Sequence, residues 1–184
     1  MPSSRRARLA LALALATGLA TPASGKVYLS RQEALAWAFP EAERVEERSV
    51  ALSDEQARAV ESLARERLES RIVKLYTAHG ESGVQGHAFI DVHTVRTLPE
   101  AFLVVLTPEG EVRSLRVLAF YEPEEYRPPE RWLAQFERRR LEPGLHLGGA
   151  IHGIAGSTLS ARAVTGSVRR ALALYRVLVQ GGRD

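Results

Sequence analysis

The segment Gly148-Gly149-Ala150-Ile151-His152-Gly153-Ile154-Ala155-Gly156-Ser157-Thr158-Leu159-Ser160 joins a glycine-rich stretch to the most strongly periodic part of the chain. After it, apolar residues recur at steps of three and four, which is the period of a helix with one buried face. These residues are Val164, Val168, Ala171, Leu172, Tyr175 and Leu178. We therefore predict a long C-terminal helix that begins at the end of this segment.

Two interpretations of the helix start follow from its residues. A glycine-rich turn leaves the first N–H groups of a helix free beside the positive end of its dipole, and both favour a bound phosphate or other anion. Alternatively, the hydroxyl of Ser157, Thr158 or Ser160 simply caps the helix. The residues on their own leave both interpretations open.

Two further helix starts lie upstream, and both have the pattern of a capping box. Ser30 is followed by Glu33, and the helix that they begin should end at Phe39-Pro40 because the residue before a proline disfavours helix. Ser53 is followed by Gln56, and the apolar face of the second helix comprises Ala57, Val60, Leu63, Ala64 and Leu68. A short third helix is expected after the prolines at 128–129.

Strand patterns fill the middle of the chain. Residues 44–52 are polar and weakly alternating, which suggests an edge strand, and residues 72–78 and 84–95 suggest two more. Residues 102–106 are continuously apolar, as in a strand buried on both faces, and pair with 112–120 as a hairpin. The predicted fold class is α+β, an antiparallel sheet flanked by helices, in one domain over residues 26–184.

The first 25 residues resemble a secretory signal peptide. Arg5, Arg6 and Arg8 precede the apolar run 9–19, and small residues follow at 21–25, so cleavage after Ala23 or Gly25 would fit. We therefore expect an exported protein, periplasmic or otherwise extracytoplasmic. A retained segment that associates the protein with the membrane is the alternative.

Composition narrows the function classes. The chain has no cysteine, which excludes disulfides, thiolate metal sites and a cysteine nucleophile. Its formal net charge is only +3, and no basic stripe is interleaved with aromatic residues, so nothing supports nucleic-acid binding.

The histidine and serine residues also give little support for a metal site or for a serine nucleophile. His87 and His93 lie on one predicted strand about 20 Å apart at about 3.3 Å per residue, too far for one metal ion unless the strand bends. Asp91 and His93 can pair on one strand face. The segment 156–160 does not match a Gly-x-Ser-x-Gly nucleophile elbow. No convergent acid, base and nucleophile set suggests an enzyme with its own substrate.

The segment 152–161 resembles the signature of FMN-binding domains, in which Asp-x-x-Ser/Thr-Gly-Ala-Thr-x-Ser/Thr precedes a long helix. Examples are the exported flavin-carrying domains of the sodium-translocating NADH:quinone reductase and of the related Rnf complex. The hairpin around Pro108-Glu109-Gly110-Glu111, the acidic loop Tyr121-Glu122-Pro123-Glu124 and the segment 95–100 also fit. The likeness covers most of residues 27–179 and is closest to stand-alone exported FMN-binding proteins.

The resemblance implies an exported electron-transfer protein whose flavin phosphate is held at the turn before the C-terminal helix. Thr158 would anchor the phosphate, through a phosphoester bond where a flavin transferase acts on the chain. The cofactor-binding residues implied are Ile154, Gly156, Ser157, Thr158, Leu159 and Ser160, with Glu122 and the loop around Tyr121 near the flavin ring. The implied partners are that transferase and a membrane redox protein.

The segment also departs from the family pattern. His152 stands where the family has Asp, Ala155 where it has Ser or Thr, and Ser157 where it has Ala, whereas Gly156 and Thr158 are kept. A transferase that reads the missing groups would not attach FMN, so non-covalent binding is better supported than covalent attachment. A flavin-free binding or structural module that keeps the fold is the alternative function.

Overall fold

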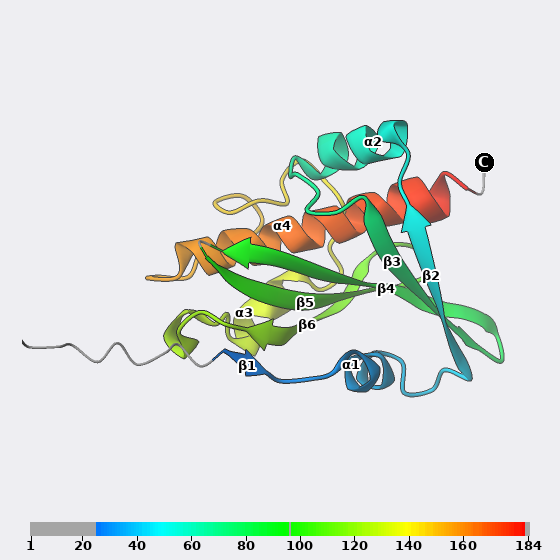
Figure 1. The fold of residues 1–184 in the computed structure, drawn as a ribbon, viewed down its shortest axis with the longest axis horizontal. Coiled ribbons are helices and arrows are strands. Elements are labelled where there is room, and N and C mark those ends of the chain that lie inside the picture. Colours follow the sequence, from blue (N-terminus) through cyan, green and yellow to red (C-terminus); the bar gives the residue numbers. More distant parts are fainter. Residues whose placement is uncertain (1–24, 96, 183–184) are drawn as a thin grey trace, which may run out of the picture.

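A computed structural model describes residues 25–95 and 97–182. At its centre is a six-stranded antiparallel sheet with the strand order β1-β6-β5-β4-β3-β2 (Figure 1). The strands are β1 (Lys26–Val27), β2 (Arg44–Ala51), β3 (Ile72–Gly80), β4 (Gly83–Val95), β5 (Leu98–Leu106) and β6 (Val112–Phe120). The predicted α+β class and the edge position of residues 44–51 are thus confirmed.

Four α-helices accompany the sheet in the described chain: α1 (Arg31–Ala38), α2 (Asp54–Ala64), α3 (Glu130–Leu133) and α4 (Thr158–Tyr175). Short 3-10 turns cover Glu124–Tyr126 and Ala134–Phe136, and a π-helical turn, Arg176–Gln180, extends α4. Both predicted capping boxes form, at Ser30 and at Ser53. Helix α2 ends at Ala64 because Arg65 adopts a positive φ of 55°, so Leu68 lies beyond the helix in which its pattern had placed it.

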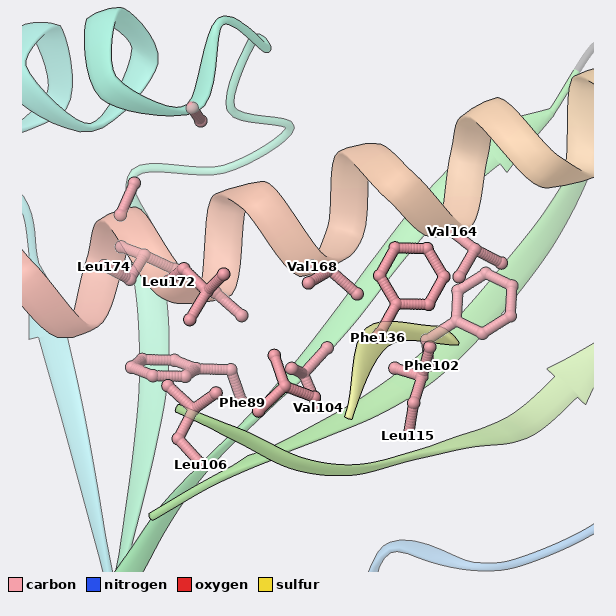
Figure 2. Packing of buried hydrophobic residues seen from close by; sticks show 14 of the residues in the cluster. Phe89, Phe102, Val104, Leu106, Leu115, Phe136, Val164, Val168, Leu172 and Leu174 are labelled. Carbon is pink, nitrogen blue, oxygen red and sulfur yellow. The ribbon is translucent and has the colours of Figure 1, made fainter. Parts of the chain in front are cut away.

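The helices cover the two faces of the sheet unequally. Helix α4 crosses one face with α2 above it, whereas α1 lies against the other face (Figure 1). Figure 2 shows Val164, Val168 and Leu172 of α4 pointing down towards Phe102 and Val104 of β5. Because α2 covers the outer side of α4, most of the α4 residues are buried.

Strand β5 begins at Leu98, four residues before the predicted start at Phe102. The four extra residues pair with the end of β4, so that Val95 lies opposite Leu98 and His93 lies opposite Glu100. Pro99 sits in this stretch and interrupts the apolar pattern, which is why the sequence did not indicate a strand there. The extension therefore places Glu100 within the sheet, where its side chain is fully buried.

Two further differences concern the ends of the chain. Strand β1 was not predicted, because two residues carry no periodic pattern; it pairs with β6 at Phe120 and Ala119. The expected signal peptide falls on residues 1–25, which lie outside the described part apart from Gly25. Among the described helices, none is long and apolar enough to cross a membrane.

Candidate functional site at the start of helix α4

A cavity of about 280 Å³ opens beside the first turn of α4. Three segments that are distant in sequence line it: the end of β4, the loop after β6, and the turn that leads into α4. The lining residues are Val95, Glu122, Tyr126, Gly156, Ser157, Thr158, Leu159 and Ser160. The structure therefore brings Glu122 together with the predicted residues 156–160. Ile154 does not line this cavity and packs against the hydrophobic core.

The start of α4 is not capped by a side chain. Ser157 is the N-cap residue, with φ −122° and ψ 42°, and its hydroxyl makes no capping hydrogen bond. The first helical hydrogen bond runs from the N–H of Ala161 to the carbonyl of Ser157, at 3.0 Å. The interpretation in which a hydroxyl caps this helix is therefore wrong. The N–H groups of the first turn find no backbone or side-chain acceptor in the described part of the chain, and they remain available to an anion.

Gly156 shapes the approach to this helix end. Its φ is +79°, a left-handed conformation that favours glycine, and a Cβ atom placed on it would meet nothing within 4 Å. Thr158, two residues on, is exposed and lines the cavity, whereas Ser157 and Ser160 are buried. Among the three hydroxyl-bearing residues at this helix start, Thr158 is therefore the most exposed.

A carboxylate, that of Glu122, also belongs to the cavity wall. Oε1 of Glu122 is buried and has no hydrogen-bond partner within residues 25–95 and 97–182. Tyr126 contributes an aromatic wall in the same loop. Tyr121, which was expected near the ligand with Glu122, packs instead beside Gly25. A ligand here would thus meet helix N–H groups on one side and a carboxylate and a phenol ring on the other.

A buried polar network lies beneath α4 next to this cavity. Asp91 accepts hydrogen bonds from Nε and Nη2 of Arg170, at 2.9 and 2.6 Å, and its Oδ2 lies 2.9 Å from Nδ1 of His93. The predicted pairing of Asp91 with His93 is therefore confirmed. Burial alone would raise the pKa of Asp91, but the hydrogen bonds from Arg170 and His93 outweigh it and hold that pKa well below its usual range.

The network does not have the geometry of a catalytic triad. The Ser167 hydroxyl donates to Asp91 Oδ2 at 2.6 Å and lies on the Nδ1 side of His93, the side that already faces the carboxylate. Ser167 is completely buried, so no substrate reaches it. Within the described residues no group of three or more His, Asp or Glu side chains is arranged to hold a metal ion.

The network extends towards the cavity through Glu100. Nε2 of His93 lies 3.8 Å from Oε2 of Glu100, which is fully buried. Burial raises the pKa of Glu100 to about 7; the charge of His93 opposes this rise and the charge of Glu122 adds to it. Glu100 thus interacts electrostatically both with His93 in the buried network and with Glu122 in the cavity wall.

Two of the three residues that depart from the family pattern, His152 and Ala155, lie outside the cavity wall, whereas the third, Ser157, lines it. His152 is exposed, and its backbone is held by a bond from its N–H to Gln135 Oε1, at 2.9 Å, and one from Trp132 Nε1 to its carbonyl, at 2.7 Å. Ala155 is exposed as well. Neither side chain contributes to the surface that would contact a ligand.

Sequence patterns missed three residues of this region. Val95 and Tyr126 line the cavity, and the charge of Glu122 in its wall acts on Glu100. Val95 and Glu100 belong to the segment 95–100 that resembles the family, but nothing in that likeness indicated a role for either residue at the site. A signal for Glu100 did exist, since Glu100 is an acidic residue two positions before the apolar run 102–106 and therefore shares the buried face of Phe102.

A larger cavity of about 610 Å³ adjoins the site and shares Val95 and Leu159 with it.

No protein-family model matches the chain, and no curated protein matches it either.

Proposed function

We propose that this chain is an exported FMN-binding protein that carries electrons, with the flavin phosphate held at the start of α4. The observation that carries the proposal is the uncapped helix start that faces a cavity lined by Thr158. A phosphate there would accept hydrogen bonds from free backbone N–H groups and lie at the positive end of the helix dipole. The likeness of residues 152–161 to FMN-binding domains supports the choice of ligand.

The dimensions of the site agree with this ligand in part. A cavity of about 280 Å³ lies just below the usual range of small-molecule sites, about 300–1,000 Å³. It accommodates the phosphate end of a nucleotide rather than a whole one. Val95 and Leu159 lead from it into the adjoining 610 Å³ cavity, which offers additional apolar surface for a ring.

Each part of the chain has a defined task under this proposal. When bound, FMN supplies one- or two-electron redox chemistry. The first turn of α4 binds and orients the phosphate, and Gly156 allows the backbone to approach it closely. Thr158 offers an accessible hydroxyl for a phosphoester bond if a flavin transferase meets the chain. A membrane redox protein is the proposed electron partner of the exported domain.

The test is the intact mass of protein coexpressed with a flavin transferase, measured after denaturation. Covalent carriage adds the mass of FMN less one water, and Thr158→Ala abolishes this addition. Ser157→Ala is the matched control, because it removes the neighbouring hydroxyl, which is buried, and should leave the addition intact.

Non-covalent binding needs a separate measurement. Purified protein without added mass should still bind FMN more tightly than riboflavin, which lacks the phosphate. A colourless protein with no affinity for added FMN would contradict the proposal and would leave the flavin-free binding or structural module as the function.

A further inference from the structure

Glu100 is buried without the partners that a buried carboxylate needs. Its exposed fraction is 0%, and neither Oε1 nor Oε2 has a hydrogen-bond partner among the described residues. Nε2 of His93 lies 3.8 Å from Oε2 of Glu100, which is beyond hydrogen-bond distance. A charged carboxylate in this place is costly, whereas its protonated form is not.

The charges around Glu100 come from three elements. His93 on β4 faces it directly, and Glu122, in the loop after β6, faces it with a charge of the same sign. On α4, Arg170 is occupied by its two hydrogen bonds to Asp91, which in turn contacts His93. The positive charge of Arg170 is therefore compensated by Asp91, so it does little to stabilise an ionised Glu100.

We propose that Glu100 is a positioning residue that must carry a proton when a phosphate-bearing ligand occupies the cavity at the start of α4. This inference rests on the proposed FMN-binding function and adds its regulation by pH. The proton comes from solvent and adds to one carboxylate oxygen to give a neutral acid. No other bond forms or breaks.

The physical reason is the accumulation of negative charge in a small buried region. Glu122 lines the cavity, and a bound phosphate adds up to two further negative charges close to it. A third acidic group in the ionised state would repel both. Protonation of Glu100 removes that repulsion, so ligand binding and proton uptake are thermodynamically linked.

The experiment measures the dissociation constant of FMN for the full chain at pH 7.0 and at pH 8.5. The phosphate of FMN, with a second pKa near 6, is close to fully ionised across this range, so the charge of the ligand stays nearly constant. We expect binding about 15-fold weaker at pH 8.5, because the carboxyl, half protonated near pH 7, must take up a proton from solvent before the ligand binds and is almost fully ionised at pH 8.5.

Two variants test whether the pH dependence of FMN binding comes from Glu100 or from another acidic residue. Glu100→Gln mimics the protonated acid, so its FMN affinity should be the same at both pH values. Glu125→Gln is the matched control, since Glu125 is exposed in the same loop as Glu122 and should keep the pH dependence of the wild type. Equal pH dependence in the wild type and in Glu100→Gln would overturn the inference.

A measurement on the ligand-free protein keeps the test independent of FMN. Carbon-13 NMR of the glutamate carboxyl groups should show one resonance that titrates near pH 7, is absent in Glu100→Gln and moves to lower pH in Glu122→Gln. A Glu100 resonance that titrates near its ordinary pKa would overturn the inference. Binding of FMN that does not depend on pH overturns the inference alone, whereas no binding at any pH overturns the proposed function with it.

Discussion

The pKa values of two carboxyl groups in one network, Asp91, which is mostly buried, and Glu100, which is fully buried, are shifted in opposite directions by their surroundings. Asp91 receives hydrogen bonds from Arg170, His93 and Ser167, which stabilise its charged form despite burial. Glu100 receives none within the described chain, so burial dominates and raises its pKa. The same strand pair therefore holds one permanently charged group and one that can exchange a proton near neutral pH.

Asp91→Asn should destabilise the protein strongly. The substitution keeps the shape of the side chain but leaves the guanidinium of Arg170, which is 8% exposed, buried beside no negative charge. Breaking a buried ion pair in this way typically costs about 3–5 kcal/mol. The free energy of unfolding at pH 7, from guanidinium chloride titration followed by circular dichroism, measures the loss.

The control for this prediction is Asp54→Asn. Asp54 pairs with Arg71 on the surface, where both side chains are more than half exposed, so its loss should cost at most about 1 kcal/mol. Similar costs for the two variants would mean that burial does not strengthen the Asp91 pair.

The stabilisation by Asp91 is complete above the ordinary pKa of an aspartate, about 4, and should disappear as the pH falls through its lowered pKa.

At the scale of elements, the turn between β5 and β6 is fastened to the end of α4. The hydroxyl of Tyr175 donates a hydrogen bond to the carbonyl of Pro108, at 2.7 Å. Gly110 in the same turn has a φ of +81°, and the ring of Tyr175 lies where a Cβ atom on it would be placed. The hairpin turn thus depends on glycine both for its conformation and for the close approach of α4.

Gly110→Ala should therefore lower the free energy of unfolding by about 2–4 kcal/mol, from backbone strain and from the displaced Tyr175 ring. Thermal and denaturant unfolding measure the loss. Gly83→Ala is the matched control, because φ there is +108° but a Cβ atom would meet nothing within 4 Å. If both variants lose the same stability, the contact with Tyr175 contributes nothing.

At the scale of the whole molecule, Arg169 joins three segments that are far apart in sequence. From the middle of α4 its guanidinium donates to the carbonyls of Leu63 and Ala64 at the end of α2, and to that of Leu145, at 2.7 Å. Helix α2 ends without a capping side chain for these carbonyls, so Arg169 satisfies backbone groups that the helix itself leaves open. It thereby fixes α2 and residues 141–147 against α4.

Arg169→Met should destabilise the fold by about 2–4 kcal/mol, because it fills similar space but leaves buried carbonyls without donors. Amide hydrogen exchange should also accelerate in residues 141–151 and near the end of α2. Arg162→Met is the control, since Arg162 is exposed on the same helix and should have little effect. Unchanged exchange in residues 141–151 would contradict the cross-linking role of Arg169.

The sequence by itself determined the features that depend on neighbouring residues. The capping boxes at Ser30 and Ser53, the alternating strands and the long helix after Ser157 follow from local hydrogen bonding and from periodic burial. The same local patterns located the turn at 156–160. Family likeness, rather than periodicity, pointed to Glu122 as its companion.

Only the tertiary structure decided which groups meet and what charge they carry. The pairing of β4 with β5 places Glu100 opposite His93, and burial under α4 then removes the water that would stabilise its charge. The N-cap geometry of Ser157, which leaves the helix start open, likewise depends on how the turn enters the fold. Register and desolvation arise from contacts between residues distant along the chain, and no local pattern encodes them.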